Sequence, residues 1–443
     1  MVQSRPILST GWRPMKGVVF DVSVPRFIVA KTVGRVTDSA FYGLLSGLRL
    51  RDLPALELPG PHWVELEVIA GGICGSDLGN LTYDSSPAME PFGSFPAVLG
   101  HEILGRVKSV GDAVTRVGVG QRAAVNPAIS CTTRGYSTTD RCPSCASGYH
   151  FTCERAGEEA RTMVAGRHLS AGAMIGYHRD LRGGWGETVI AHESQVFAVG
   201  DELSDNAAVL MEPFSIAMHA VLQSPPREHQ PVLVIGSGAI ALATVWAIRA
   251  TGFEGSVLAQ VKRSHEKELA LAMGASEVVE PGPEARQALV ETGASAYMPI
   301  VGAEVFSGGG FPVVYDCVGN DSSLAQSLRF ASPRGQIVVI GCVGELRKLD
   351  LTFLWARELR VRGSVGYGQE TWRGERRHTF EITHDLLVET AAPVHDLVTH
   401  AFPLHQYRDA LRAAANHRRS GAVKVILVPG AGATPVSGLS PRG

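Results

Sequence analysis

Three short motifs, far apart in this sequence, carry side chains of the types that can bind a metal ion. They are Gly72-Ile73-Cys74-Gly75-Ser76-Asp77, Gly100-His101-Glu102 and Met211-Glu212-Pro213. Each motif alone is a weak signal, because a lone cysteine is usually a small buried apolar residue. Together, a thiolate, an imidazole and a carboxylate can hold zinc and leave room for a substrate oxygen. The combination therefore indicates a zinc site that could do chemistry.

Four of the seven cysteines crowd into one short stretch rich in Ser, Thr and Gly. Two residues separate Cys142 from Cys145, Cys153 follows after seven more, and Cys131 precedes Cys142 by a ten-residue spacer that must fold back. Four thiolates predict a closed, structural zinc site. The alternatives are a redox-active Cys-x-x-Cys pair, which lacks its usual strand-then-helix context, and a nucleic-acid-binding zinc ribbon, which the sparse basic residues disfavour.

A glycine turn follows an apolar run in the second half of the chain. Val232–Ile235 leads into Gly236-Ser237-Gly238-Ala239-Ile240-Ala241, a spacing that seats a pyrophosphate on the first amides of a helix. Ala241 replaces the third glycine, where only a small side chain is needed. The alternative is an ordinary turn between core elements. A second strand roughly 20 residues on favours the dinucleotide site.

The end of that second strand reads Gln260-Val261-Lys262-Arg263. A site that prefers NAD presents an Asp or Glu there to the ribose hydroxyls. Lys262 and Arg263 could instead bind a 2′-phosphate, so the sequence favours NADP over NAD. The alternative is that both cations only cap a helix in solvent.

Two styles of secondary structure must position these residues. The first half suggests an irregular, mostly antiparallel domain with strands at Gly17–Phe20, Phe27–Lys31 and Val64–Ala70. From about Pro231 the pattern is that of a doubly wound parallel sheet, with strands at Val232–Ile235, Ser256–Gln260, Pro312–Asp316 and Gln336–Ile340 and a helix at Glu266–Met273. After about Val361 the antiparallel style returns and closes with a strand at Ala422–Val428, followed by a tail expected to fray.

Length and composition limit the possible functions. With 443 residues, 45% of them hydrophobic, the chain can build two cores. Its 41 basic and 43 acidic residues give a net charge of -2, which recruits neither nucleic acid nor an anionic membrane. Met1–Phe20 does not read as a signal peptide, and the apolar run Val232–Ala250 reads as a strand and a helix rather than a membrane span. These features predict a cytoplasmic protein whose cysteines serve metal or catalysis.

In this order, the motifs resemble those of zinc-containing medium-chain dehydrogenases, from about Met15 to Val428. Asp316-Cys317-Val318-Gly319 and the closing Lys424-Val425-Ile426-Leu427 complete the pattern. The resemblance is to the branch with sorbitol, threonine and secondary-alcohol dehydrogenases, because Glu212 stands where other alcohol dehydrogenases have a cysteine. It implies an α/β chain: a GroES-like catalytic domain (1–212, with the zinc lobe at about 131–153, and 356–443) and an inserted Rossmann domain (213–355).

The resemblance also implies roles for individual residues. Cys74 and His101 would ligate the catalytic zinc, with Glu102 or Glu212 as third ligand or holder of a water. Asp77 would orient His101, and Ser76 would take the proton of an alcohol made acidic by zinc, while hydride passes to the nicotinamide. Many relatives have a histidine that ends the proton relay, but Gly79 stands at that place here. The resemblance therefore does not assign the route by which the proton leaves. The dinucleotide would contact Gly236, Ser237, Gly238, Ala239, Ile240, Lys262, Arg263, Val318 and Gly319.

The sequence thus predicts an oxidoreductase with two zinc ions that acts on a small alcohol or polyol, or on the matching ketone or aldehyde. Two alternatives are a catalytically silent relative that only binds dinucleotide and a zinc-free quinone reductase of the same fold. Relatives form dimers or tetramers, so a homo-oligomer is expected. The stretch Val33–Leu50 interrupts the first sheet, and the sequence assigns it no function.

Overall fold

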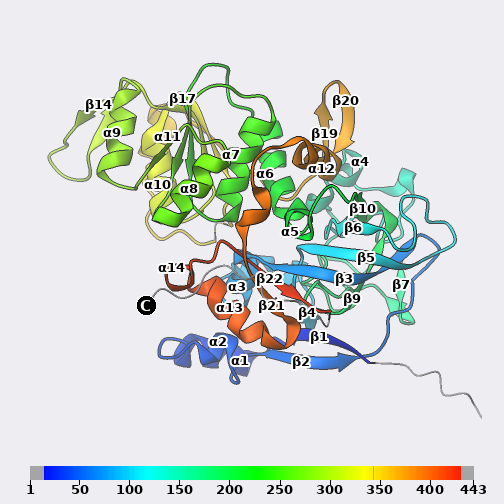
Figure 1. The fold of residues 1–443 in the computed structure, drawn as a ribbon. Helices are drawn as coiled ribbons and strands as arrows, with labels where there is room; N and C mark the ends of the chain where they lie inside the picture. Colours follow the sequence, from blue (N-terminus) through cyan, green and yellow to red (C-terminus); the bar gives the residue numbers. More distant parts are fainter. Residues whose placement is uncertain (1–13, 343, 431–443) are drawn as a thin grey trace, which may run out of the picture.

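A strand that is buried along nearly its whole length organises the first of two sheet-based regions. In the computed structural model, which describes residues 14–342 and 344–430, β3 (Trp63–Ile73) pairs antiparallel with β5 (Ile103–Val110), β9 (Thr188–His192) and β22 (Lys424–Val428) (Figure 1). Its apolar residues reach three different core clusters. In its first half Val64, Leu66 and Val68 alternate with Glu65 and Glu67, as in a strand with one face on the core, whereas residues 68–73 are all apolar or glycine.

The rest of this region extends the same architecture. β6 (Arg122–Val125), β10 (Val196–Val199) and β21 (Val398–Pro403) complete the seven-stranded sheet, in which β21 and β22 pair in parallel. A second sheet consists of β1 (Met15–Phe20) between β2 (Leu48–Leu53) and β4 (Ala97–Val98). The predicted strands at Gly17–Phe20, Val64–Ala70 and Ala422–Val428 are confirmed as β1, β3 and β22.

The second region is a six-stranded sheet in which all neighbours are parallel. Its order is β13 (Glu277–Val279), β12 (Val257–Gln260), β11 (Val232–Ile235), β16 (Phe311–Asp316), β17 (Ala331–Val339) and β18 (Arg360–Gly363). Alternate residues of β11 enter different clusters, so helices cover both faces. The four predicted strands and the predicted helix, which is α8 (Ser264–Ala272), are confirmed. The strand order reverses between β11 and β16, where such sheets bind their ligands.

Helices surround the two sheets. Beside the parallel sheet lie α7 (Ala239–Ala250), α9 (Pro283–Glu291), α10 (Asp321–Phe330) and α11 (Thr352–Ala356). α6 (Met211–Gln223) packs against both α7 and α12 (Thr379–Glu389) and so links the regions. The expected boundary between residues 212 and 213 falls inside α6, and the parallel sheet continues to β18. The later segment also contains α13 (Tyr407–Ala415), α14 (His417–Ser420) and the antiparallel hairpin of β19 (Gln369–Trp372) and β20 (Glu375–His378).

Shorter elements connect these parts. They are the helices α3 (Gly75–Leu81), α4 (Pro143–Ala146) and α5 (Asp205–Ala208) and the strand pairs β7 (Met163–Val164) with β8 (Arg167–His168) and β14 (Ser295–Tyr297) with β15 (Val305–Ser307). Single turns of 3-10 helix lie at Pro87–Phe92, Thr138–Asp140, His150–Thr152, Glu193–Gln195, Val394–Leu397 and Leu404–Gln406.

The predicted strand at Phe27–Lys31 is wrong, because this stretch lies in helix α1 (Val24–Val33). β1 already has a strand on each side, so the sheet offers no free edge next to it. Proline fits the first helical turn, where Pro25 stands. Tertiary context therefore outweighs the strand preference of Phe27 and its β-branched neighbours. α1 and α2 (Ser39–Tyr42) lie in the segment that connects β1 to β2. This segment includes most of Val33–Leu50.

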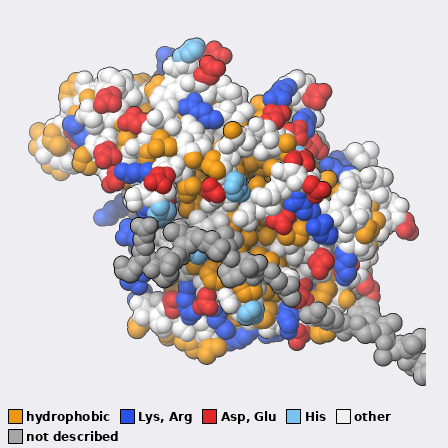
Figure 2. Space-filling view, in the orientation of Figure 1, with side chains coloured by type: hydrophobic (Ala, Val, Ile, Leu, Met, Phe, Trp, Pro, Cys, Tyr) orange, Lys and Arg blue, Asp and Glu red, His pale blue; other side chains and the backbone are white. Residues whose placement is uncertain are grey.

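The surface agrees with the near-zero net charge. On the face shown in Figure 2, basic and acidic side chains are interspersed. Among the described residues, no helix is both long and apolar enough to cross a membrane, and Val232–Ala250 forms β11 and α7 as predicted. The tail that was expected to fray lies mostly at residues 431–443. Much of the N-terminal stretch, for which the sequence predicts no signal peptide, lies at residues 1–13. Both lie outside the described part of the chain.

Two backbone segments cross at van der Waals distance just before His101. Gly183 and Gly184 donate hydrogen bonds to the carbonyls of Val98 and Gly100, at 2.9 and 2.7 Å. A Cβ on Gly183 would lie 2.3 Å from the carbonyl oxygens of Leu99 and Gly100. Only glycine at 183 allows the segments to approach this closely.

We expect Gly183→Ala to destabilise the protein by at least about 1–3 kcal/mol, the usual penalty for overpacking, because backbone must move. Gly186→Ala is the matched control, since its Cβ would meet no atom closer than 3.4 Å. Chemical denaturation measures both. Equal stabilities of the two variants would contradict the crossing as described.

Candidate zinc and dinucleotide sites

The fold brings Cys74, His101 and Glu102 together. One potential ligand atom of each lies within 4.8 Å of the others. Cys74 follows β3 and caps α3, while His101 and Glu102 lie on the segment between β4 and β5. Glu212 is buried at the start of α6 but does not belong to this cluster of mutually close donor atoms. The geometry thus unites three of the four residues predicted around the catalytic zinc.

Asp77 is fully buried and contacts both Cys74 and His101. Its carboxylate accepts a hydrogen bond from the Cys74 backbone N–H at 2.9 Å, and its Oδ1 lies 3.4 Å from His101 Nδ1. Burial by itself would lower the pKa of His101, but the negative charges of Asp77 and Cys74 raise it well above its ordinary value. With Nδ1 facing Asp77, Nε2 is the ring nitrogen available to a metal.

Glu102 forms a buried ion pair with Lys424. Both carboxylate oxygens lie close to Lys424 Nζ, at 2.5 and 2.8 Å. The negative charges of Glu102 and Cys74 raise the pKa of Lys424 against the effect of burial, so the amine stays charged. A Cβ on Gly72 would lie 1.8 Å from Glu102 Oε2, so glycine at 72 makes room for this carboxylate.

Glu212 lies in the first turn of helix α6, close to the same cluster. Its Oε1 accepts a hydrogen bond from Tyr367 at 3.0 Å, and its Oε2 has no hydrogen-bond partner in the described part of the chain. Burial raises the pKa of Glu212 to about 7, although the charge of His101 opposes the shift. A buried carboxylate with one free oxygen can accept a hydrogen bond from water or from a ligand hydroxyl.

These residues fit a zinc ion with an open coordination position. Thiolate, imidazole and carboxylate are the donors zinc prefers, and catalytic zinc sites use three protein ligands. Cys74 is half-buried, so the cluster can be reached from solvent. His101 and Glu102 are buried, where Asp77 contacts His101 and Lys424 pairs with Glu102.

Tyr177 is part of this site and was not predicted from the sequence. Its hydroxyl lies 3.0 Å from Ser76 Oγ and 2.8 Å from Asp77 Oδ1, and its ring lies 5.5 Å from that of His101. Burial, and then the negative charge of Asp77, raise the pKa of Tyr177 well above its ordinary value, which keeps the hydroxyl protonated. Tyr177 thus positions the Ser76 hydroxyl. A tyrosine in the Gly-rich stretch before Trp185 carries no spacing signal that points to Ser76.

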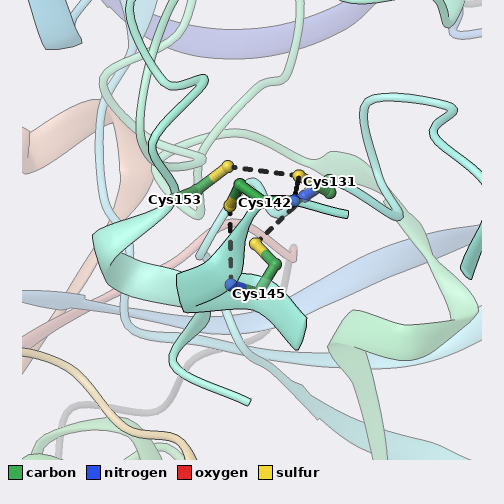
Figure 3. Close-up of side chains that lie close together, drawn as sticks. All are labelled: Cys131, Cys142, Cys145 and Cys153. Atoms are coloured by element: carbon green, nitrogen blue, oxygen red, sulfur yellow. Dashed lines mark hydrogen bonds between the residues drawn. The ribbon is translucent and has the colours of Figure 1, made fainter. Parts of the chain in front are cut away.

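The four lobe cysteines converge around one point (Figure 3). All are buried free thiols whose sulfur atoms lie within 4.8 Å of one another. Cys131 Sγ and Cys153 Sγ are 3.8 Å apart, which matches the roughly 3.8 Å edge of a tetrahedron with Zn–S bonds of about 2.3 Å. Backbone N–H groups of Cys131, Cys142 and Cys145 donate to cysteine sulfurs at 3.4–3.5 Å. The lobe fits a closed zinc site, and the long spacer does fold back.

The glycine turn lies at the carboxyl edge of the parallel sheet. Gly236 has a φ of +135° and packs against Ala241 and Cys317, while a Cβ on Gly238 would meet open space. Gly238 precedes α7, so Ala239 and Ile240 form its first turn, with Ser237 partly exposed beside them. Open space before the first amides of a helix suits a pyrophosphate.

The loop after β16 lies beside this turn, since Ile235 and Asp316 are paired in the sheet. Asp316 Oδ1 accepts hydrogen bonds from the backbone N–H groups of Val318 and Gly319, both at 3.0 Å. Gly319 has a φ of +69°, a conformation that favours glycine. The fold therefore places Val318 and Gly319 on the same edge as Gly236.

The two cations after β12 have different surroundings. Lys262 is exposed, whereas Arg263 forms an ion pair with the buried Glu266 one turn into α8. Gln260, at the end of β12, is buried and exchanges amide hydrogen bonds with Gln326. No carboxylate stands at the strand end, as the sequence indicated, and Lys262 is the cation with freedom to meet a ligand.

Comparison with known proteins agrees with this architecture. Residues 60–201 match the alcohol dehydrogenase GroES-like domain, and residues 235–379 match the zinc-binding dehydrogenase domain. Sorbitol dehydrogenase of Arabidopsis thaliana is 27% identical over 403 residues, covering 88% of this chain and 96% of that protein. L-threonine 3-dehydrogenase of Saccharopolyspora erythraea is 27% identical over 383 residues, covering 86% and 95%.

Solved structures agree as well. A protein from Sinorhizobium meliloti 1021, described as a zinc-binding dehydrogenase and bound to NADP, superposes with a TM-score of 0.66 at 26% identity. The match covers 94% of this chain and all of that one. The chain belongs to the zinc-dependent medium-chain dehydrogenases. It is an oxidoreductase that uses zinc and NAD(P) on a small-molecule alcohol or on the matching carbonyl compound.

We expect Tyr177→Phe to lower kcat for alcohol oxidation by about 10- to 100-fold, the usual effect of removing a group that supports a metal site. Zinc content and melting temperature should change little, because the ring and its packing remain. Tyr83→Phe is the matched control, since the Tyr83 hydroxyl is buried without a hydrogen-bond partner in the described residues. An unchanged kcat in Tyr177→Phe would exclude a positioning role.

Proposed function

We propose that this enzyme transfers hydride between a polyol or secondary alcohol and NAD(P) at a zinc ion held by Cys74, His101 and Glu102. The observation that carries the proposal is the convergence of these three donors within 4.8 Å, beside a second carboxylate on Glu212. The same convergence speaks against a catalytically silent or zinc-free protein. The names of the relatives, which include sorbitol dehydrogenase and L-idonate 5-dehydrogenase, favour a polyol.

The protein side chains divide the remaining work. Bound zinc would act as a Lewis acid that makes an alcohol hydroxyl more acidic. Ser76 accepts the hydroxyl proton as it passes its own proton on toward solvent, and Tyr177 holds the Ser76 side chain in place. Asp77 fixes the ring of His101. Glu212 Oε2 accepts a hydrogen bond from water or from a second hydroxyl of a polyol, a group that a simple alcohol lacks.

Substrate profiling tests this function directly. Zinc-loaded enzyme is mixed with NADP or NAD and a panel containing sorbitol, xylitol, threonine, butane-2,3-diol and propan-2-ol, with ketones and NAD(P)H for the reverse direction. We expect a change in nicotinamide absorbance with at least one vicinal diol or polyol, and its loss in Cys74→Ser. The absence of turnover with every alcohol and ketone, in enzyme shown to contain zinc, would refute the proposal.

We further propose that the four-cysteine lobe holds a second, structural zinc ion, so that the chain binds two in total. Cys142→Ser should reduce the zinc content from two to one per chain, as measured by elemental analysis. The melting temperature should fall by about 4–8 °C or more, since roughly 2 kcal/mol corresponds to that shift in a domain of 150–250 residues. The control is Cys342→Ser, because Cys342 is an exposed free thiol. Two zinc ions retained in Cys142→Ser would contradict this assignment.

We propose NADP as the preferred cofactor, bound along Gly236–Ile240, with Val318 and Gly319 on the neighbouring loop and Lys262 and Arg263 near the 2′-phosphate. Lys262→Ala should raise KM for NADP about tenfold, the equivalent of one charge-assisted hydrogen bond, and leave KM for NAD unchanged. Lys267→Ala is the control, because Lys267, on helix α8 just after Lys262, pairs with Glu280. Equal effects of Lys262→Ala on both cofactors would contradict the preference.

We also propose a domain division, an oligomeric state and a cellular location. The division at residues 1–212, 213–355 and 356–443 follows the change of sheet type along the chain, with α6 spanning the first boundary and β18 lying beyond the second. A dimer or tetramer is supported by the edge strand β18, which is exposed along its length and lies near the exposed side chain of Val365. A cytoplasmic location is supported by the seven cysteines, which form no disulfide with one another, as is usual in a reducing compartment.

A further inference from the structure

A cavity of about 330 Å³ lies between the four-cysteine lobe and the hairpin of β19 and β20. The two segments lie side by side in Figure 1, where α4 of the lobe is next to the hairpin. The backbone N–H of Gln369 donates to the carbonyl of Gly148 at 3.2 Å, which joins the hairpin to the lobe at the cavity. Apart from Cys145 of the lobe, the residues that line this cavity belong to none of the sites described above.

Three arginines line the cavity, and no carboxylate does among the residues that the structure describes. Arg376 donates to the carbonyl of Ser147, and Arg116 pairs with Glu381, at 3.1 Å. Arg141 is half-buried and forms no ion pair or side-chain hydrogen bond within the described ranges, and its Nε is buried without a partner. The lining therefore carries an excess of fixed positive charge.

Burial and the nearby positive charges lower the pKa values of two histidines in the cavity. Burial, and then the charge of Arg141, lower the pKa of His150. Burial, and then the charges of His150 and Arg116, hold the pKa of His378 well below its ordinary value. Both rings are therefore neutral at neutral pH, so the positive charge of the cavity lies on its arginines, of which Arg116 is paired with Glu381.

We propose that this cavity binds a small multivalent oxyanion, an organic phosphate or a di- or tricarboxylate. Guanidinium groups match the planar, bidentate geometry of such oxyanions. The rings of Phe197 and His378, stacked at 4.7 Å, add a flat wall for a carbon skeleton. The volume is at the lower end of small-molecule sites, so a metabolite fits and a dinucleotide does not.

Side-chain contacts connect the cavity to the catalytic region. The ring of His378 lies 6.3 Å from that of Tyr367, whose hydroxyl holds Glu212. A bound anion would join the lobe, the loop with Arg116 and the hairpin, three segments that pack around the same aromatic residues. Binding should therefore stabilise the lobe.

Isothermal titration calorimetry on the zinc-loaded protein, saturated with NADP to occupy the dinucleotide site, tests the proposal. The probes are inorganic phosphate, sulfate and succinate, each compared with chloride at equal ionic strength. We expect one saturable site per chain for at least one probe, and a higher melting temperature in its presence. Preference for phosphate or for succinate distinguishes the two ligand classes.

Arg141→Gln should weaken the binding at least tenfold, and Arg376→Gln provides a second variant in case the first is unstable. Arg167→Gln is the matched control: it makes the same change of charge on an exposed residue near the lobe whose partner is Asp180. Absence of saturable binding to the wild-type protein, or equal affinity in Arg141→Gln and Arg167→Gln, would overturn the proposal.

Discussion

The buried ion pair of Glu102 and Lys424 holds the two ends of the catalytic region together. Lys424 is the first residue of β22, and β22 pairs with β3 next to Cys74. Burying two charges costs several kcal/mol per ion, and only their mutual attraction repays it. Loss of either partner would leave an unpaired buried charge, at about 3–5 kcal/mol. The closing strand is thus tied to the segment that supplies His101 and Glu102.

Asp77 performs a similar task over a shorter range. Its carboxylate contacts the backbone of Cys74, the ring of His101 and the hydroxyl of Tyr177. The ligand cysteine, the ligand histidine and the holder of Ser76 therefore share one buried anion. A displacement of this carboxylate would move all three, which is why its support by Tyr177 matters for catalysis.

The two regions are coupled mechanically as well as chemically. Glu212 lies in the first turn of α6, near the candidate zinc site, and α6 then packs along α7, the helix that starts at the glycine turn. The dinucleotide turn and the surroundings of the zinc cluster are thus connected through two packed helices. Tyr367, which holds Glu212, belongs to the segment that returns from the parallel sheet.

Local sequence patterns predicted the elements whose geometry depends on few neighbouring residues. The turn at Gly236 requires a positive φ, and the four parallel strands are short apolar runs, so both could be recognised along the chain. The spacing of the four cysteines likewise predicted a zinc lobe. α1 was missed because the filled edges of β1, which are a tertiary property, exclude Phe27–Lys31 from the sheet.

Contacts between distant segments could not be predicted in this way. Nothing in the spacing singled out Tyr177 as the partner of Ser76, or Arg141 as an unpaired cation in the same cavity as Arg376. The sequence left Glu102 and Glu212 equivalent, and folding brings only Glu102 into the group with Cys74 and His101. A motif reports the conformation of its own backbone, whereas a site made from several loops depends on how those loops pack against one another.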